Sequence, residues 1–90
     1  MSVLLVTYDL HQSYKDCQEI MKFIQAAAAW AKLSESSYAI KTQETPKSMM
    51  NYLQPLLHKT NRLFVVTLTY PYAGYGSESV NMWLKNNLSE

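Results

Sequence analysis

The chain has 90 residues, of which 48% are hydrophobic and 17% are charged, and its formal net charge is +1. This composition excludes intrinsic disorder, which needs lower hydrophobicity and more charge. The small net charge excludes a strong overall field for nucleic acid, so any such role must depend on local clusters of charge. A chain of this length forms one domain with a thin core. We therefore expect residues 1–90 to form a single domain that gains from a partner subunit, as a homodimer.

The expected location follows from cysteine use and from the apolar runs. Cys17 is the one cysteine, so no disulfide can form within a chain, which fits a reducing compartment. The first residues lack the charged region and the cleavage site of a signal peptide. No apolar run approaches the roughly 18 residues of a membrane span. We expect a cytoplasmic protein with no membrane partner.

The first third of the sequence predicts a strand followed by a helix. Ser2–Asp9 is almost continuously apolar before it ends in Thr-Tyr-Asp, which is typical of a central strand buried on both faces. Apolar residues then recur at helical spacing from Tyr14 to about Trp30, and the alanine run 26–29 has a high helix propensity. Ser13 is the expected N-cap of this helix.

The middle of the chain predicts two strands and a second helix. A very short strand is expected at residues 31–33 and a firmer one at Ser37–Thr42, with a turn between them. Thr45 followed by Pro46 is a typical helix start, a capping hydroxyl before proline at the first helical position. Pro55 should kink or interrupt this helix.

The last third predicts a strand, an aromatic loop and a third helix. Residues 62–70 alternate in the manner of a strand, with Phe64, Val66 and Leu68 on one face. The loop that follows holds three tyrosines, and Ser77 is the expected cap of the last helix. Trp83 lies on the apolar stripe of that helix, so we expect it to be largely buried, at a cost of about 3–5 kcal/mol when it is replaced by alanine.

This order of elements predicts an α/β (α+β) domain in which the helices cover one face of a sheet. The arrangement that fits best is a ferredoxin-like βαββαβ sandwich with an extra C-terminal helix.

Several segments resemble a known family. Residues 4–10 are similar to the first strand of the Cas2 proteins of CRISPR systems, a hydrophobic strand that ends in Tyr-Asp and an aliphatic residue. A closer similarity is to short Cas2-like proteins labelled SinR-like. The shared motifs are Val-Thr-Tyr-Asp-Leu at 6–10, Trp-Ala-x-Leu-x-Glu-Ser at 30–36, Arg-Leu-Phe-Val-Val at 62–66 and Asn-x-Trp-Leu at 81–84.

The resemblance implies a ferredoxin-like homodimer that acts on RNA or DNA. Some Cas2 proteins are described as metal-dependent nucleases, and others are structural parts of a DNA-integrating complex. The family's proposed metal ligand is the aspartate that ends the first strand, which corresponds to Asp9. The expected ion is Mg²⁺ or Mn²⁺. The resemblance also places a polar residue near the active face, where this chain has Ser36 and Ser37.

Three residues are candidates for catalysis: Asp9, His11 and Ser37. In a two-fold dimer, two Asp9 carboxylates would favour a shared proton or a divalent cation, and a bound cation can activate water for phosphodiester cleavage. The alternative is that Asp9 only caps the approach to the first helix. His11 suits a base or a ligand, although an isolated histidine is usually only a loop residue, and turn chemistry explains Ser37 equally well.

The aromatic segment has two possible functions. Tyr70, Tyr72 and Tyr75 suit the stacking of bases, or the packing of a protein partner on this C-terminal segment. Three functions therefore remain: a metal-dependent nuclease or endoribonuclease that binds nucleic acid, a non-catalytic dimerisation or adaptor module, and a toxin-like ribonuclease.

Overall fold

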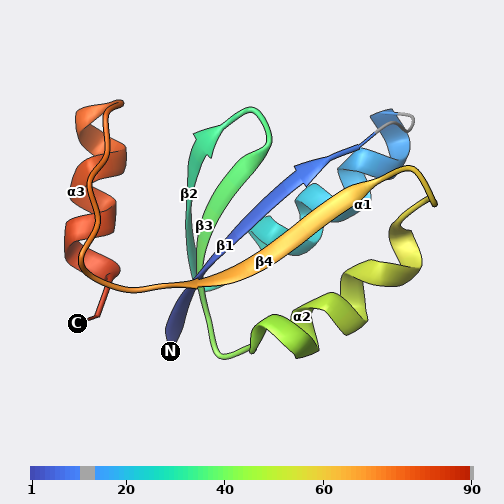
Figure 1. Cartoon of the computed structure of the whole chain (residues 1–90), viewed down its shortest axis with the longest axis horizontal. Coiled ribbons are helices and arrows are strands. Elements are labelled where there is room, and N and C mark those ends of the chain that lie inside the picture. The colour runs from blue at the N-terminus through green and yellow to red at the C-terminus, as the bar shows by residue number, and fades with distance from the viewer. Residues whose placement is uncertain (11–13, 90) are drawn as a thin grey trace.

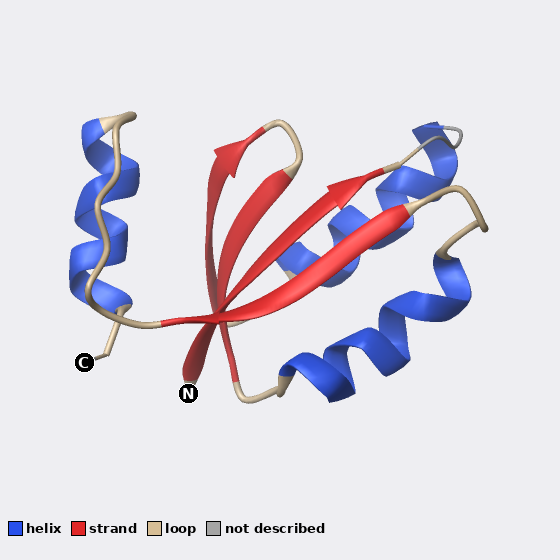
Figure 2. Ribbon diagram, viewed as in Figure 1, coloured by secondary structure: helices blue, strands red, loops and turns tan. Residues whose placement is uncertain are grey.

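The computed structural model describes residues 1–10 and 14–89, together with side chains except those of residues 14–17. The described residues form a four-stranded sheet and three α-helices, which Figures 1 and 2 show from the same side. In chain order the elements are β1 (Ser2–Asp9), α1 (Tyr14–Gln25), β2 (Ala29–Ser34), β3 (Ser37–Thr42), α2 (Pro46–Leu53), the 3₁₀ turn η1 (Gln54–Leu56), β4 (Arg62–Leu68) and α3 (Glu78–Asn87).

The sheet has the order β2-β3-β1-β4, and each pair of neighbours is antiparallel. The segment from β1 through α1 leads to β2, with β3 between the two strands. The segment from β3 through α2 leads to β4, with β1 between them. Two strand–helix–strand units are therefore interleaved in one sheet, and the predicted α+β class is confirmed at this level.

One face of the sheet packs on α1 and α2, which lie side by side along it in Figure 1. The side chains of β1 alternate, so Leu4 and Val6 point to this face and are fully buried. The helices contribute matching apolar residues at helical spacing. The main cluster consists of Leu4, Val6, Ile20, Ile24, Tyr38, Ile40, Met49, Leu53 and Leu63.

The third helix lies elsewhere, on the opposite face near one end of the sheet (Figure 2). Its Leu84 and Leu88 pack with Val3 of β1 and Ala39 of β3 in a second buried cluster. The prediction that helices cover a single face therefore holds for α1 and α2 and is wrong for α3. The physical reason is that β1 is apolar on both faces, so part of the second face also needs cover.

The prediction that the first helix continues through the alanine run 26–29 is wrong. α1 ends at Gln25, residues 26–28 turn, and Ala29 already belongs to β2. Trp30 and Ala31 lie opposite Ile40 and Ala39 of β3. Strand pairing between distant residues thus overrides the high helix propensity of alanine.

The helix starts at Thr45 and Ser77 are confirmed as caps. The Thr45 side-chain oxygen accepts a hydrogen bond from the Ser48 N–H at 3.1 Å, and that of Ser77 accepts one from the Val80 N–H at 3.3 Å. The α-helix also stops before Pro55, as predicted, and continues only as η1. The proposed cap Ser13 lies outside the described residues. β4 ends at Leu68, two residues earlier than expected.

Trp83 is of intermediate exposure and packs against the second cluster, so most of its surface is buried and a smaller part stays in water. We predict that Trp83→Ala lowers the free energy of unfolding by about 1–2 kcal/mol, because part of the ring stays in water in the folded state. Leu53→Ala, at a fully buried site, should cost about 2–5 kcal/mol. Urea unfolding of the two variants measures the difference, and a larger loss for Trp83→Ala would contradict the prediction.

Candidate functional site

Asp9 is the last residue of β1 and its side chain is exposed. The antiparallel register places it directly opposite Arg62, the first residue of β4. Alternation along β1 puts Asp9 on the same face as Thr7 and Leu5, the face that α1 and α2 do not cover. The strand therefore presents its one acidic side chain at the rim of an open sheet face, opposite the one arginine of the chain.

The loop before β4 adds a second cation to this position. Asp9, Lys59, Thr60, Asn61 and Arg62 line one open depression of about 610 Å³. Asn61 shapes the loop, because its backbone N–H donates to the His58 carbonyl at 3.0 Å and its side-chain oxygen accepts from the His58 N–H at 2.8 Å. Two cations and one carboxylate leave the depression with a local charge of one positive unit.

Such a depression suits a phosphate group. Lysine and arginine are the usual partners of phosphate oxygens, and arginine offers a planar pair of donors. Threonine hydroxyls make similar contacts with nucleic-acid backbones. The sequence interpretation singled out Asp9 but not Lys59 or Thr60. The sequence feature that could have indicated them is the run of basic residues at 58–62, at the start of a strand. Its position opposite Asp9 follows only from the register of β1 and β4.

One chain alone fits a divalent cation poorly. Among the side chains that the structure describes, those of residues 1–10 and 18–89, no group of three or more His, Cys, Asp or Glu is placed to hold a metal ion. Asp9 offers one carboxylate, whereas Mg²⁺ usually needs one or two together with other oxygen ligands, and Lys59 and Arg62 oppose a second positive charge nearby. A magnesium site at Asp9 would therefore need the carboxylate of a second copy. His11, the other candidate here, lies outside the described residues.

Ser37 lies on the same face as Asp9 but away from the depression. It begins β3 opposite Thr7, and the two hydroxyl oxygens are 3.0 Å apart. The structure thus gives Ser37 a cross-strand hydrogen bond and does not bring it into the group of residues around Asp9. Tyr8 points to the other face, where its hydroxyl donates to the Met21 sulfur at 3.2 Å.

The uncovered part of the sheet, hereafter the open face, is apolar beside its charged rim. Phe64 is 64% exposed and lies opposite Thr7, and Val66 is 49% exposed and lies opposite Leu5. Adjacent exposed apolar side chains on one sheet face are typical of interaction sites. The open face comprises Leu5, Thr7, Asp9, Ser37, Arg62, Phe64 and Val66.

Two of the loop tyrosines have structural partners. The Tyr70 hydroxyl donates to the Lys85 carbonyl at 2.9 Å, and the Tyr72 hydroxyl donates to the Asn81 carbonyl at 3.2 Å. Both bonds fasten the loop to α3, and the two rings lie 5.7 Å apart. Tyr75, in contrast, is fully exposed. Of the three tyrosines considered for base stacking, Tyr75 is thus the one whose ring lies fully in solvent.

Comparisons with family models, with curated proteins and with solved structures find no match to this chain. In the part of the chain that is described, no helix has the length and apolar character to cross a membrane. The geometry of the site therefore carries the functional argument, together with the sequence motifs.

The hydrogen bond between Thr7 and Ser37 generates a test of the structural role of Ser37. We predict that Ser37→Ala lowers the free energy of unfolding by about 0.5–1.5 kcal/mol, the usual net worth of such a bond. A double-mutant cycle with Thr7→Val should give a coupling energy of about 1 kcal/mol. Chemical denaturation of the four proteins measures both quantities, and zero coupling would show that the two hydroxyls do not interact.

Proposed function

We propose that this protein is a Cas2-like homodimer that binds the phosphate backbone of RNA or DNA at the charged rim of the open face. The observation that carries the proposal is the depression in which Asp9 lies together with Lys59 and Arg62. Phosphate contacts supply most of the affinity of sequence-independent nucleic-acid binding. A local pair of cations can serve this purpose even though the whole chain has a net charge of only +1.

The proposed fold is the ferredoxin-like one. It is supported by the sheet order β2-β3-β1-β4, by the antiparallel pairing of all neighbours and by the two interleaved strand–helix–strand units. The resemblance of residues 6–10, 30–36 and 62–66 to Cas2-like proteins points to the same fold. Cytoplasmic location belongs to the same proposal.

The proposed dimer forms through the open face. Phe64 and Val66 together expose apolar surface that association would remove from water. A two-fold axis through this face brings two copies of Asp9 into one assembly, and an isologous interface of this kind is the commonest in homodimers. The second carboxylate supplies what one chain lacks for Mg²⁺ or Mn²⁺.

The proposed chemistry is metal-dependent cleavage of a phosphodiester, as a nuclease or endoribonuclease. Lys59 and Arg62 would neutralise the phosphate and fix its position. The Asp9 pair would hold the cation, whose role is to polarise a phosphoryl oxygen and to lower the pKa of bound water.

A second candidate is a non-catalytic adaptor, which the exposure of Phe64 and Val66 also favours. In this function the open face binds another copy or another protein, and Asp9 and Arg62 act only as a cross-strand pair of opposite charges. The adaptor and the nuclease share the dimer and differ in whether the charged rim binds phosphate.

The dimer generates a first prediction. The wild type should have twice the 10.4 kDa mass of one chain in light scattering at micromolar concentration. Phe64→Asp should give the monomer mass, because a charge would be buried without a partner at the interface. Met82→Asp is the matched control, since Met82 is 50% exposed on α3 and away from the open face. A monomeric wild type would rule out the dimer.

The charged rim generates a second prediction. Arg62→Gln and Lys59→Gln should each weaken the binding of single- and double-stranded RNA and DNA about three- to tenfold at low salt and reduce the salt dependence, because each removes one phosphate contact. Lys47→Gln, which alters an exposed lysine on α2, should change neither. Fluorescence anisotropy at several salt concentrations provides the measurement.

Asp9→Asn tests the catalytic step in the same dimer. Cleavage of RNA or DNA with Mg²⁺ or Mn²⁺ should disappear in this variant and in the presence of a chelator, while nucleic-acid binding remains. Cleavage that survives both treatments would exclude the metal mechanism. A wild type that binds but never cleaves would retain only the scaffold role, and one that does neither would support the adaptor.

A further inference from the structure

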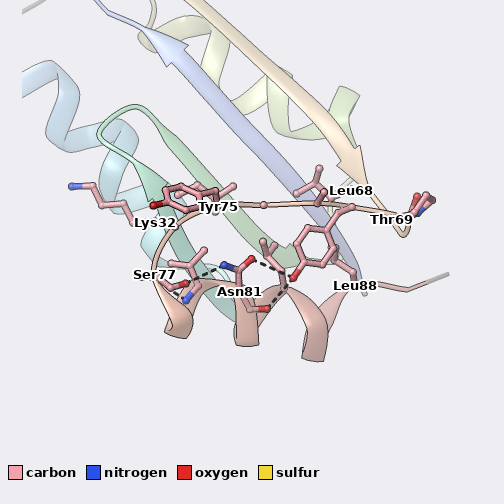
Figure 3. A pocket seen from close by; sticks show the side chains of 15 residues that line it. Lys32, Leu68, Thr69, Tyr75, Ser77, Asn81 and Leu88 are labelled. Carbon is pink, nitrogen blue, oxygen red and sulfur yellow. Dashed lines mark hydrogen bonds between the residues drawn. The ribbon is translucent and has the colours of Figure 1, made fainter.

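Two hollows among the described residues lie near opposite ends of the sheet, and each is bordered by a loop that an asparagine holds in place. The first is the depression around Asp9, beside the turn of residues 58–61. The second is a cavity of about 480 Å³ between α3, the end of β2 and the loop of residues 69–77 (Figure 3). Leu68 lines this cavity, and six residues of β4, or about 20 Å, separate it from Arg62. The two loops can therefore be compared within one chain.

The turn of residues 58–61 is closed by two hydrogen bonds between its first and last residues. The Asn61 N–H donates to the His58 carbonyl at 3.0 Å, and the Asn61 side-chain oxygen accepts from the His58 N–H at 2.8 Å. The first is the backbone bond of a β-turn, whereas the second depends on the side chain. A substitution of Asn61 therefore removes the second bond and leaves the partners of the first in place.

The nitrogen of the Asn61 side chain is buried and has no hydrogen-bond partner among the described residues. The N–H of His58 requires an acceptor, so the amide keeps its oxygen toward His58 and its nitrogen in the buried position. A buried nitrogen does not reach a phosphate bound at the surface of the depression. Asn61 therefore acts through the turn, as a positioning residue, and not as a ligand of the phosphate.

Lys59 and Arg62 are held in place by different parts of the structure. Arg62 begins β4 and pairs with Asp9, so the strand ladder fixes its main chain. Lys59 and Thr60 are the two central residues of the turn and belong to no strand or helix. Both are exposed, so packing does not fix them either. The position of Lys59 relative to Arg62 thus depends on the bonds that close the turn.

We propose that Asn61 is the residue that positions Lys59 beside Arg62, so that both cations meet the phosphate together. This role rests on the phosphate binding proposed above. A turn that is ordered before binding avoids the conformational entropy that a loose loop would lose. Asparagine supplies the acceptor without a charge, whereas aspartate at this position would lower the local charge of the depression from one positive unit to zero.

The test is a set of double-mutant cycles read by fluorescence anisotropy with a labelled single-stranded RNA and the DNA of the same sequence. Asn61→Ala should weaken binding about three- to tenfold, the loss expected for Lys59→Gln. The double variant of Asn61→Ala with Lys59→Gln should lose no more than Lys59→Gln alone, because both changes remove one contact. The losses of Asn61→Ala and Arg62→Gln should multiply, because β4 holds Arg62 independently of the turn.

Asn61→Asp is the isosteric variant, which keeps the side-chain oxygen and adds a charge. Hydrogen exchange of the His58 N–H should be as slow in Asn61→Asp as in the wild type and faster in Asn61→Ala. Asn61→Asp should still weaken binding, through its charge. Its loss should multiply with that of Lys59→Gln, because Lys59 stays in position in this variant.

Asn81 provides the matched control at the other hollow. Its side-chain amide donates to the Ser77 carbonyl at 3.3 Å, and its backbone carbonyl accepts from the Tyr72 hydroxyl at 3.2 Å (Figure 3). Asn81→Ala removes the side chain that fastens a loop, as Asn61→Ala does, but beside the cavity. It should keep the wild-type affinity for both nucleic acids.

Three results would overturn the role of Asn61 while the proposed function stands. They are unchanged binding by Asn61→Ala, losses of Asn61→Ala and Lys59→Gln that multiply, and an equal loss in Asn81→Ala. A wild type that binds neither RNA nor DNA would overturn both the role and the function.

Discussion

The register of β1 between β3 and β4 is the constraint on which the rest of the structure depends. Leu4 and Val6 are fully buried because this register turns them toward α1 and α2. A slip of one residue would move both side chains to the other face and lose their burial, so the apolar pattern holds the register strongly. The same register sets Asp9 opposite Arg62. The packing of the core therefore determines the geometry of the charged rim, although no residue of the rim belongs to the core.

Because β1 is apolar on both faces, the sheet cannot be completed by α1 and α2 alone. α3 covers the end of the second face around Val3, through Leu84 and Leu88. Phe64 and Val66 remain exposed farther along β4. Burial of apolar surface is worth about 25 cal/mol per Å², so the uncovered part retains a driving force for association that the fold of one chain leaves unused.

The sequence predicted those elements whose signals are local. The alternation and apolar runs of Ser2–Asp9 and Ser37–Thr42 located both strands as the structure has them, and the hydroxyl of Thr45 located a helix start. The alanine run 26–29 led to the wrong prediction of a helix. Ala29 is a strand residue because it pairs with Lys41, and local propensity contains no information about this distant partner.

For the candidate site too, the sequence predicted what local signals determine and not what depends on pairing between distant residues. Asp9 could be placed at the end of a strand from the apolar run that precedes it. Its neighbours could not, because Lys59 and Arg62 are about 50 residues away in the chain and reach Asp9 only through the pairing of β1 with β4. Ser37 was expected near the active face, whereas the structure gives it a cross-strand hydrogen bond with Thr7, away from the residues around Asp9.

The charged rim and the cavity should respond to different variables, because different physical effects govern them. Contacts of Lys59 and Arg62 with phosphate are exposed, so added salt weakens them. The cavity is lined by Leu84 and Leu88, which also join α3 to the sheet. A ligand that binds there binds only the folded arrangement of α3, so its binding free energy adds to the stability of that helix on the sheet. Salt leaves this apolar contribution in place, because screening by ions acts on charged groups. A stabilisation of α3 by a ligand that persists at high salt is therefore due to binding in the cavity. A stabilisation that is lost at high salt is due to contacts with the charged groups.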